Sequence, residues 1–312
     1  NGVVVISKKE KDASSGTPHA QLHSYEVLGD NCVWETSIRK HKITPTYPDG
    51  TGIRYTDKGL FAEFAKFALR SDLDPDIDAH KPYQYKHLDY RLVDFANNKY
   101  RQTWDAFTTA YGYLIHNYNP SDGLKMVVFV DMDSSDKKAE GRNGKSLTMK
   151  TLERFKQTAF IDGKLFRKSL NDSSRFNFSN VTVDTRLVII NDLNPDLDMT
   201  QLFSHIADDF TIEDKGKSKI IIPQDKKPKM CCNTNYVITG SGPSYDGRQH
   251  IVEFGNYWNK CEKLGIKPKD ILGKKLCDED FTQEDWDEFY QFGFYCVWKY
   301  LNNGLMEAEN SD

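Results

Sequence analysis

Short apolar runs that end in polar residues are the most regular feature of the chain. Three of them predict buried strands, at Met126 to Val130, Leu187 to Ile190 and Met230 to Cys232. A fourth apolar pattern, Ile251 to Phe254, predicts another strand. The sequence therefore predicts a sheet built from largely apolar strands.

Helical patterns alternate with these runs. Apolar residues recur at helical spacing over residues 57–70, 88–118 and 284–303, and a helix is also expected over 145–159. Strands that alternate with helices in this way indicate an α/β fold with a parallel sheet.

Residues 210–223 have a different pattern, in which two short apolar arms flank a polar turn at Asp214 to Ser218. This pattern predicts a β-hairpin. Lys215, Lys217 and Lys219 lie at or beside its turn, where their charges could meet DNA backbone phosphates without reading the base sequence. A surface turn kept soluble by lysines is the alternative interpretation.

Composition narrows the class of protein. Of the 312 residues, 38% are apolar and 12% aromatic, which is enough for a large core and excludes wholesale disorder. No apolar run approaches the roughly 20 residues that span a bilayer, so we expect no membrane-spanning segment. The net charge of -4 excludes a globally basic nucleic-acid coat but not a local basic site. The six cysteines form no C-x-x-C pair, so reduced thiols in a cytoplasmic compartment are expected.

The octet Ala139 to Ser146 fits the phosphate-loop pattern A/G-x4-G-K-S/T. In such a loop, backbone N–H groups and the start of the following helix bind phosphate oxygens. Lys145, in a solvated loop, would reach the β and γ phosphates of ATP, and the Ser146 hydroxyl would hold Mg²⁺. An ordinary turn is the alternative on the motif alone, but the flanking strand and helix favour the loop. The expected nucleotide contacts are Gly141, Arg142, Asn143, Gly144, Lys145, Ser146 and Leu147.

A second polar group for such a site follows the run that ends at Ile190. Asn191 and Asp192 come directly after it, which places them at the carboxyl edge of the sheet, where ligands bind in α/β folds. Asp192 could hold Mg²⁺ through water, and Asn191 could position the attacking water. An aspartate that merely begins a turn is the alternative for this motif taken alone.

The ordered set of motifs resembles the superfamily 3 helicase core of bacteriophage and mobile-element primase-helicase proteins. The likeness rests on the phosphate loop, on Asn191-Asp192, on the stretch Lys229 to Asn235, and on Arg248 just before the last strand pattern. Trp104 to Tyr118 also resembles the helix that opens that core. The likeness covers about residues 100–300.

This resemblance implies an AAA+-like ATPase that assembles as a homo-oligomer, usually a ring of six subunits, around single-stranded DNA. By position, it implies that Asn235 is the polar sensor for water and the γ-phosphate, and that Arg248 is an arginine finger completing a neighbour's site. It also implies a translocating role for the hairpin. Two departures are the neutral Asn191, where the family usually has an acid, and the long insertion before the phosphate loop. A structural arginine paired with a local acid is the alternative for Arg248.

The fold expected is therefore an AAA+-like P-loop NTPase core with a parallel sheet, an N-terminal mixed α+β segment and C-terminal helices. We expect a collar or linking domain over residues 1–100, the ATPase core over 101–264 and helices over 265–312. The function expected is a viral or mobile-element DNA helicase in a bacterial host, with a primase module on a longer chain as a further partner. A P-loop small-molecule kinase and a DNA-binding initiator with a weak nucleotide site are the alternatives.

Overall fold

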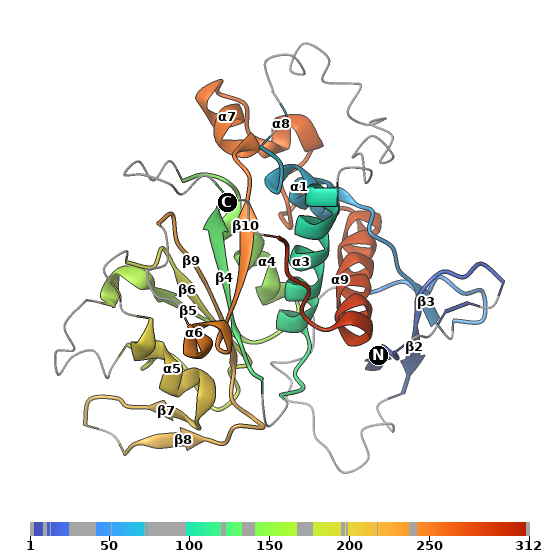
Figure 1. Ribbon diagram of the computed structural model, residues 1–312. Helices are drawn as coiled ribbons and strands as arrows, with labels where there is room; N and C mark the ends of the chain where they lie inside the picture. The colour runs from blue at the N-terminus through green and yellow to red at the C-terminus, as the bar shows by residue number, and fades with distance from the viewer. Residues whose placement is uncertain are drawn as a thin grey trace.

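The computed structural model has a parallel sheet at its centre with helices on both sides (Figure 1). The residues that the structure describes are 3–8, 11–12, 14–24, 42–50, 52–71, 73, 98–119, 123–132, 141–166, 177–194, 197, 199–216, 218–236 and 242–309.

The central sheet has five strands in the order β10-β4-β9-β6-β5, and every neighbouring pair is parallel. Their bounds are β4 (Met126–Asp131), β5 (Thr158–Asp162), β6 (Leu187–Asn191), β9 (Lys229–Asn233) and β10 (Gln249–Phe254). All carboxyl ends therefore meet at one edge of the sheet, with β9 inserted between the phosphate-loop strand β4 and the Asn191-Asp192 strand β6. The predicted α/β fold class with a P-loop NTPase-like core is confirmed.

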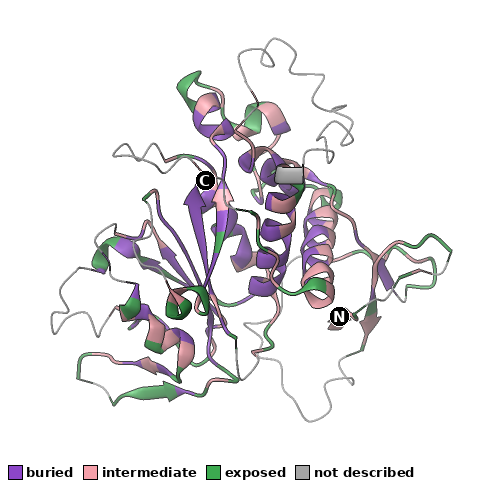
Figure 2. Cartoon of the chain, viewed as in Figure 1, coloured by how far each residue is buried: buried purple, intermediate pink, exposed green. Residues whose placement is uncertain are grey.

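The strands are buried because both faces of the sheet are covered (Figure 2). Along β4, Val127 and Phe129 belong to one hydrophobic cluster, whereas Met126 and Val128 belong to another. This alternation is the two-residue period of a strand, and it divides the interior into two cores. The apolar runs of the sequence reflect burial on both sides.

The larger, aromatic core lies on the side of α1 (Leu60–Ala68), α3 (Asn98–Ile115), α4 (Lys145–Thr151) and α9 (Gln283–Asn303) (Figure 1). Phe61 of α1 is central to it, with ring centroids 5.2 Å from Tyr111 and 5.7 Å from Phe292. Residues from all three expected domains thus share one core, while the boundaries after residues 100 and 264 stay a prediction. The other core lies under α5 (Thr200–Ala207).

Smaller elements surround these layers. An antiparallel sheet near the N-terminus has the order β1-β2-β3, and the predicted hairpin is confirmed as the antiparallel pair β7-β8. Among the described residues, no helix has both the length and the apolarity to cross a membrane. The bounds of the remaining elements are β1 (Val3–Val5), β2 (His19–His23), β3 (Gly52–Arg54), η4 (Leu152–Arg154), η5 (Gly163–Leu165), β7 (Phe210–Ile212), β8 (Ile220–Ile222), α6 (Pro243–Asp246), α7 (Tyr257–Lys263) and α8 (Pro268–Leu272).

The helix predicted over 145–159 is wrong in its second half. The chain leaves α4 through the short η4 turn, which ends at Arg154, and then forms β5. Thr158 to Asp162 alternates between buried and less buried residues, with Ala159 and Ile161 inside. That alternation has the period of an edge strand, and in so short a segment it is easily taken for the end of a helix.

Candidate nucleotide site

The phosphate loop follows β4 and leads directly into α4. Gly144 precedes the helix with a φ of 95°, a left-handed conformation that favours glycine. A Cβ at Gly144 would lie 2.8 Å from Cζ of Phe64, so the ring of α1 leaves no room for a side chain there. The first residues of the octet, Ala139 and Glu140, lie outside the described residues, as does most of the insertion before them.

Lys145 is only 3% exposed, so the expectation that it lies in a solvated loop is wrong. Its ammonium group contacts Oδ1 of Asp131, the last residue of β4, and the same oxygen accepts a hydrogen bond from Nδ2 of Asn143 at 2.6 Å. Burial lowers the pKa of Lys145, and the attraction of Asp131 offsets part of that shift. Two phosphate-loop side chains are therefore held by one buried carboxylate.

Asn233, at the end of β9, joins the two predicted motifs. Its Nδ2 donates to Oγ of Ser146 at 3.0 Å, and its Oδ1 accepts from the backbone N–H of Asp192 at 2.7 Å. The inserted position of β9 makes this possible, because its carboxyl end lies between those of β4 and β6. The structure thus brings Ser146 and Asp192 to the same place.

Asp192 has a φ of 59°, a left-handed conformation that is uncommon for a residue with a side chain and that aspartate adopts more readily than most. Its carboxylate is 2.9 Å from Nζ of Lys164, which follows β5, and this contact raises the pKa of Lys164. Asn191 is the last residue of β6, directly before it. The described residues contain no group of three or more His, Cys, Asp or Glu side chains that could hold a metal.

Mg²⁺ in phosphate sites needs only one or two protein oxygens, since the substrate phosphates and water supply the rest. The Ser146 hydroxyl and the partly exposed Asp192 carboxylate are hard oxygen ligands, and Asn233 links the two residues by contacting the Ser146 hydroxyl and the backbone N–H of Asp192. These residues fit the cation that the phosphate-loop motif implies.

Asn235 lies two residues beyond β9 and also approaches the phosphate loop. Its Nδ2 would be 3.5 Å from a Cβ built on Gly141. Its predicted sensor role stays a prediction, and the hydrogen bonds that join Ser146 to Asp192 come from Asn233 instead. Both amides lie in the stretch Lys229 to Asn235 that the sequence analysis singled out.

Helix α7 holds the outer side of the loop. Nδ2 of Asn259 donates to the carbonyl of Gly141 at 3.0 Å, and Arg142 forms an ion pair of 2.6 Å with Glu262. Arg142 has a φ of 61°, so the loop contains a left-handed residue in addition to its glycines. These contacts link the phosphate loop to the C-terminal part of the chain.

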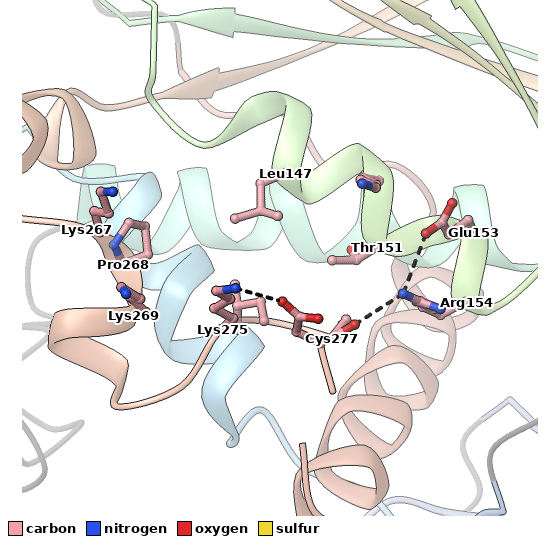
Figure 3. A pocket seen from close by; sticks show the side chains of 12 residues that line it. Leu147, Thr151, Glu153, Arg154, Lys267, Pro268, Lys269, Lys275 and Cys277 are labelled. Atoms are coloured by element: carbon pink, nitrogen blue, oxygen red, sulfur yellow. Dashed lines mark hydrogen bonds and ion pairs between the residues drawn. The ribbon is translucent and has the colours of Figure 1, made fainter. Parts of the chain in front are cut away.

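A pocket of about 470 Å³ lies beside α4 and begins at Leu147, the residue after Ser146. Figure 3 shows Leu147 and Thr151 of α4 facing Pro268 and Lys275 across it. The cations that line the pocket outnumber its two acids, Glu153 and Asp278. Those cations are Lys150, Arg154, Lys267, Lys269 and Lys275.

Arg248 lies away from the other predicted residues. It directly precedes β10, whose first residue pairs with Met126 at the start of β4, so it is at the amino edge of the sheet. Its Nη1 donates to the carbonyl of Ser244 at 3.1 Å, and its guanidinium lies 5.2 Å from the ring centroid of Phe203. Across six strand residues, this edge is roughly 20 Å from the phosphate loop. Arg248 therefore lies too far away to contact this chain's own phosphate loop, and its role as an arginine finger stays a prediction.

The hairpin lysines are partly described. Lys215 is exposed beside Gly216, which has a φ of 75° at the tip. Lys219 is 3.8 Å from Glu213 across the hairpin, so part of its charge is balanced. Lys217 lies outside the described residues.

Sequence reasoning missed three residues of this site: Asp131, Lys164 and Asn233. A signal for Asp131 was available, because an acid at the end of a buried strand is the same pattern that pointed to Asp192. Asn233 stands in the stretch that was singled out for Asn235. Lys164 follows β5, a strand that was not predicted.

No protein-family model and no curated protein sequence matches the chain. Among solved structures, it is similar to the NrS-1 C-terminal region, with 14% identity, a TM-score of 0.34, and coverage of 90% of this chain and 61% of that one. It is also similar to JCV helicase, with 13% identity, a TM-score of 0.30, and coverage of 63% and 53%. The chain thus spans about three fifths and about half of the lengths of these two proteins. A helicase is therefore among its structural neighbours.

Proposed function

We propose that the chain is the ATPase core of a DNA helicase that moves along single-stranded DNA as a ring of subunits. The observation that carries the proposal is the bridge from Ser146 through Asn233 to Asp192. It places a phosphate-loop hydroxyl and an acidic strand end in one spot, which nucleotide hydrolysis with Mg²⁺ requires.

Each residue has a role in this proposal that follows from its place. Lys145 binds the β and γ phosphates, while Ser146 and Asp192 would hold Mg²⁺, which would neutralise phosphate charge. Asn235, supported by the neutral Asn191, orients the attacking water. Water oxygen forms a bond to the γ phosphorus, the bond to the leaving ADP oxygen breaks, and the proton that the water loses passes to the phosphate product or to solvent.

The pocket beside α4 offers space for the base and ribose of the nucleotide. Leu147, one residue beyond Ser146, lines this pocket. The base and ribose of a nucleotide whose phosphates contact Lys145 would therefore extend into the pocket. In this proposal, nucleotide binding and subunit contact use opposite edges of the sheet. The nucleotide binds at the carboxyl edge, whereas Arg248 contacts a neighbouring subunit from the amino edge. The hairpin binds DNA.

The test measures ATP hydrolysis by purified protein with and without single-stranded DNA, together with its oligomeric state. We expect hydrolysis that depends on Mg²⁺ and rises with single-stranded DNA. Hydrolysis only in the presence of a small-molecule acceptor would instead support a kinase, and DNA binding without turnover would support an initiator protein. Lys215→Ala should weaken DNA stimulation and leave DNA-independent hydrolysis unchanged.

A further inference from the structure

Asp131 engages two of the donor groups that a phosphate loop would otherwise offer to a bound phosphate. The residue is 8% exposed, and its carboxylate contacts Lys145 and Asn143 through a single oxygen. Both partners belong to the phosphate loop. The anion that holds this loop is therefore part of the chain itself.

A buried ammonium group without a partner is costly, and so is a buried carboxylate without one. Asp131 and Lys145 satisfy each other, which allows the site to exist without a ligand. An incoming phosphate competes for Lys145 with a carboxylate that is already in contact. Once Lys145 turns to the phosphate, Asp131 is left as a second negative charge beside it.

The charge that Lys145 leaves behind needs another cation. Oδ1 of Asn143 is buried and has no hydrogen-bond partner among the described residues, so a second oxygen lies next to the carboxylate. Carboxylate and amide oxygens suit a hard cation or its bound water. Lys164 is in contact with Asp192, so its charge is engaged by the other acid of the site.

We propose that Asp131 is an internal counter-ion that the nucleotide phosphates displace, and that it makes nucleotide binding depend on the divalent cation which the nucleotide carries. Metal-free nucleotide meets an unpaired buried carboxylate, whereas Mg²⁺-nucleotide brings the compensating charge with it. Asp131 thereby acts through Lys145 as a specificity-determining residue for the metal-bound form of the substrate. This inference rests on the proposed nucleotide site.

The experiment titrates a non-hydrolysable ATP analogue into the protein by calorimetry, in Mg²⁺ and again in EDTA. For the wild-type protein we expect metal-free analogue to bind at least about tenfold more weakly, which corresponds to one uncompensated charge contact. Asp131→Asn should tighten metal-free binding and bring the two affinities to within about threefold. Asp131→Glu, which keeps the charge, should retain the dependence on Mg²⁺.

Two controls separate the possible failures. Asp105→Asn removes a carboxylate that pairs with Lys299 on α9, away from the site, and should leave the ratio of the two affinities unchanged. If Lys145→Ala binds Mg²⁺-analogue as tightly as the wild type, the proposed function itself fails. If Lys145→Ala loses binding but Asp131→Asn keeps the wild-type ratio, only the role of Asp131 is wrong. Equal wild-type affinities with and without Mg²⁺ overturn it even if Asp131→Asn does not fold.

Discussion

The two edges of the parallel sheet give their buried cations different partners. At the carboxyl edge, Lys145 contacts the carboxylate of Asp131. At the amino edge, Lys156 donates to the carbonyls of Leu114 at 2.9 Å and His116 at 3.2 Å, where α3 ends. The first cation has a charged partner on a side chain, and the second has neutral partners fixed in the backbone.

Lys229 repeats the amino-edge arrangement at the start of β9. Its ammonium group donates to the carbonyl of Tyr113 at 2.6 Å and to that of His116 at 2.9 Å, and lies 4.1 Å from the Tyr113 ring centroid. The carbonyls at the end of a helix lack partners within it, so these lysines cap α3. A ligand cannot replace such a partner without unfolding the helix end, whereas it can replace Asp131. The difference separates Lys145, whose partner a ligand can replace, from Lys156 and Lys229, whose partners are part of the folded backbone.

Arg248 differs from these buried lysines, and its substitution gives the largest expected effect on ATP turnover. Its guanidinium contacts one carbonyl and one aromatic ring, and the proposed function assigns it to a neighbouring subunit's site. Arg248→Ala should lower ATP turnover by about 10³-fold or more if it acts as a finger in trans, while DNA affinity is spared. Steady-state hydrolysis under conditions where a ring forms is the measurement.

Mixing variants sharpens this expectation. Arg248→Ala protein mixed with Lys145→Ala protein should recover part of the activity, because some subunit contacts then hold an intact residue of each kind. No recovery at any ratio, with normal assembly, would place Arg248 in a structural role at the amino edge.

Lys145→Ala gives the second largest effect. Turnover should fall by about 10²–10³-fold, since a cation aimed at the transferred phosphate is lost. The variant also leaves the Asp131 carboxylate buried and unpaired, which we expect to cost about 3–5 kcal/mol of unfolding free energy. Adding Asp131→Asn should restore most of the stability and none of the turnover. Chemical unfolding curves of the single and double variants measure this, and additive losses would contradict the pairing.

The sequence could predict four of the five central strands, the loop and the hairpin because each has a local pattern, whereas the pattern of β5 predicts the end of a helix. Asp192 was found by the rule that polar residues at strand ends meet at one edge, and Asp131 follows from the same rule applied to β4. The partnership of Asp131 with Lys145 could not be read, because it depends on how the loop turns back over its own strand. Asn233 was hidden for a related reason, since its bridge exists only because β9 lies between β4 and β6. Strand order is a tertiary property, and no local pattern encodes it.

Lys229→Ala tests the amino edge. It should lower the stability of the protein without changing its affinity for nucleotide. Two carbonyls at the end of α3 lose a buried donor, which we expect to cost about 2–4 kcal/mol of unfolding free energy. The affinity for Mg²⁺-nucleotide should stay within about twofold of the wild type, because the affected helix end is at the opposite edge of the sheet from Lys145. Lys150→Ala, at an exposed position on α4, is the control for stability. A loss of nucleotide affinity with unchanged stability would contradict the division between the two edges.

The smallest effect is a dependence of stability on pH that comes from the same two lysines. Burial lowers the pKa of Lys156 from 10.5 to about 7 and that of Lys229 to about 5. The charge of Arg186 adds to the shift of Lys156, and the charge of Lys156 adds to that of Lys229. The unfolded chain therefore binds more protons than the folded chain between about pH 7 and 10, so stability should rise with pH across that window. Each lysine contributes at most about 1.4 kcal/mol per pH unit, and the helix-end carbonyls reduce this because they favour the charged form.

Urea unfolding at pH 7.5 and 9 should show the higher midpoint at pH 9, and Lys229→Met should flatten the difference by up to half. Lys150→Met should leave the slope as it is in the wild type. A wild-type slope that is flat, or that falls as pH rises, would mean that both ammonium groups stay charged in the folded protein and that the carbonyls outweigh burial.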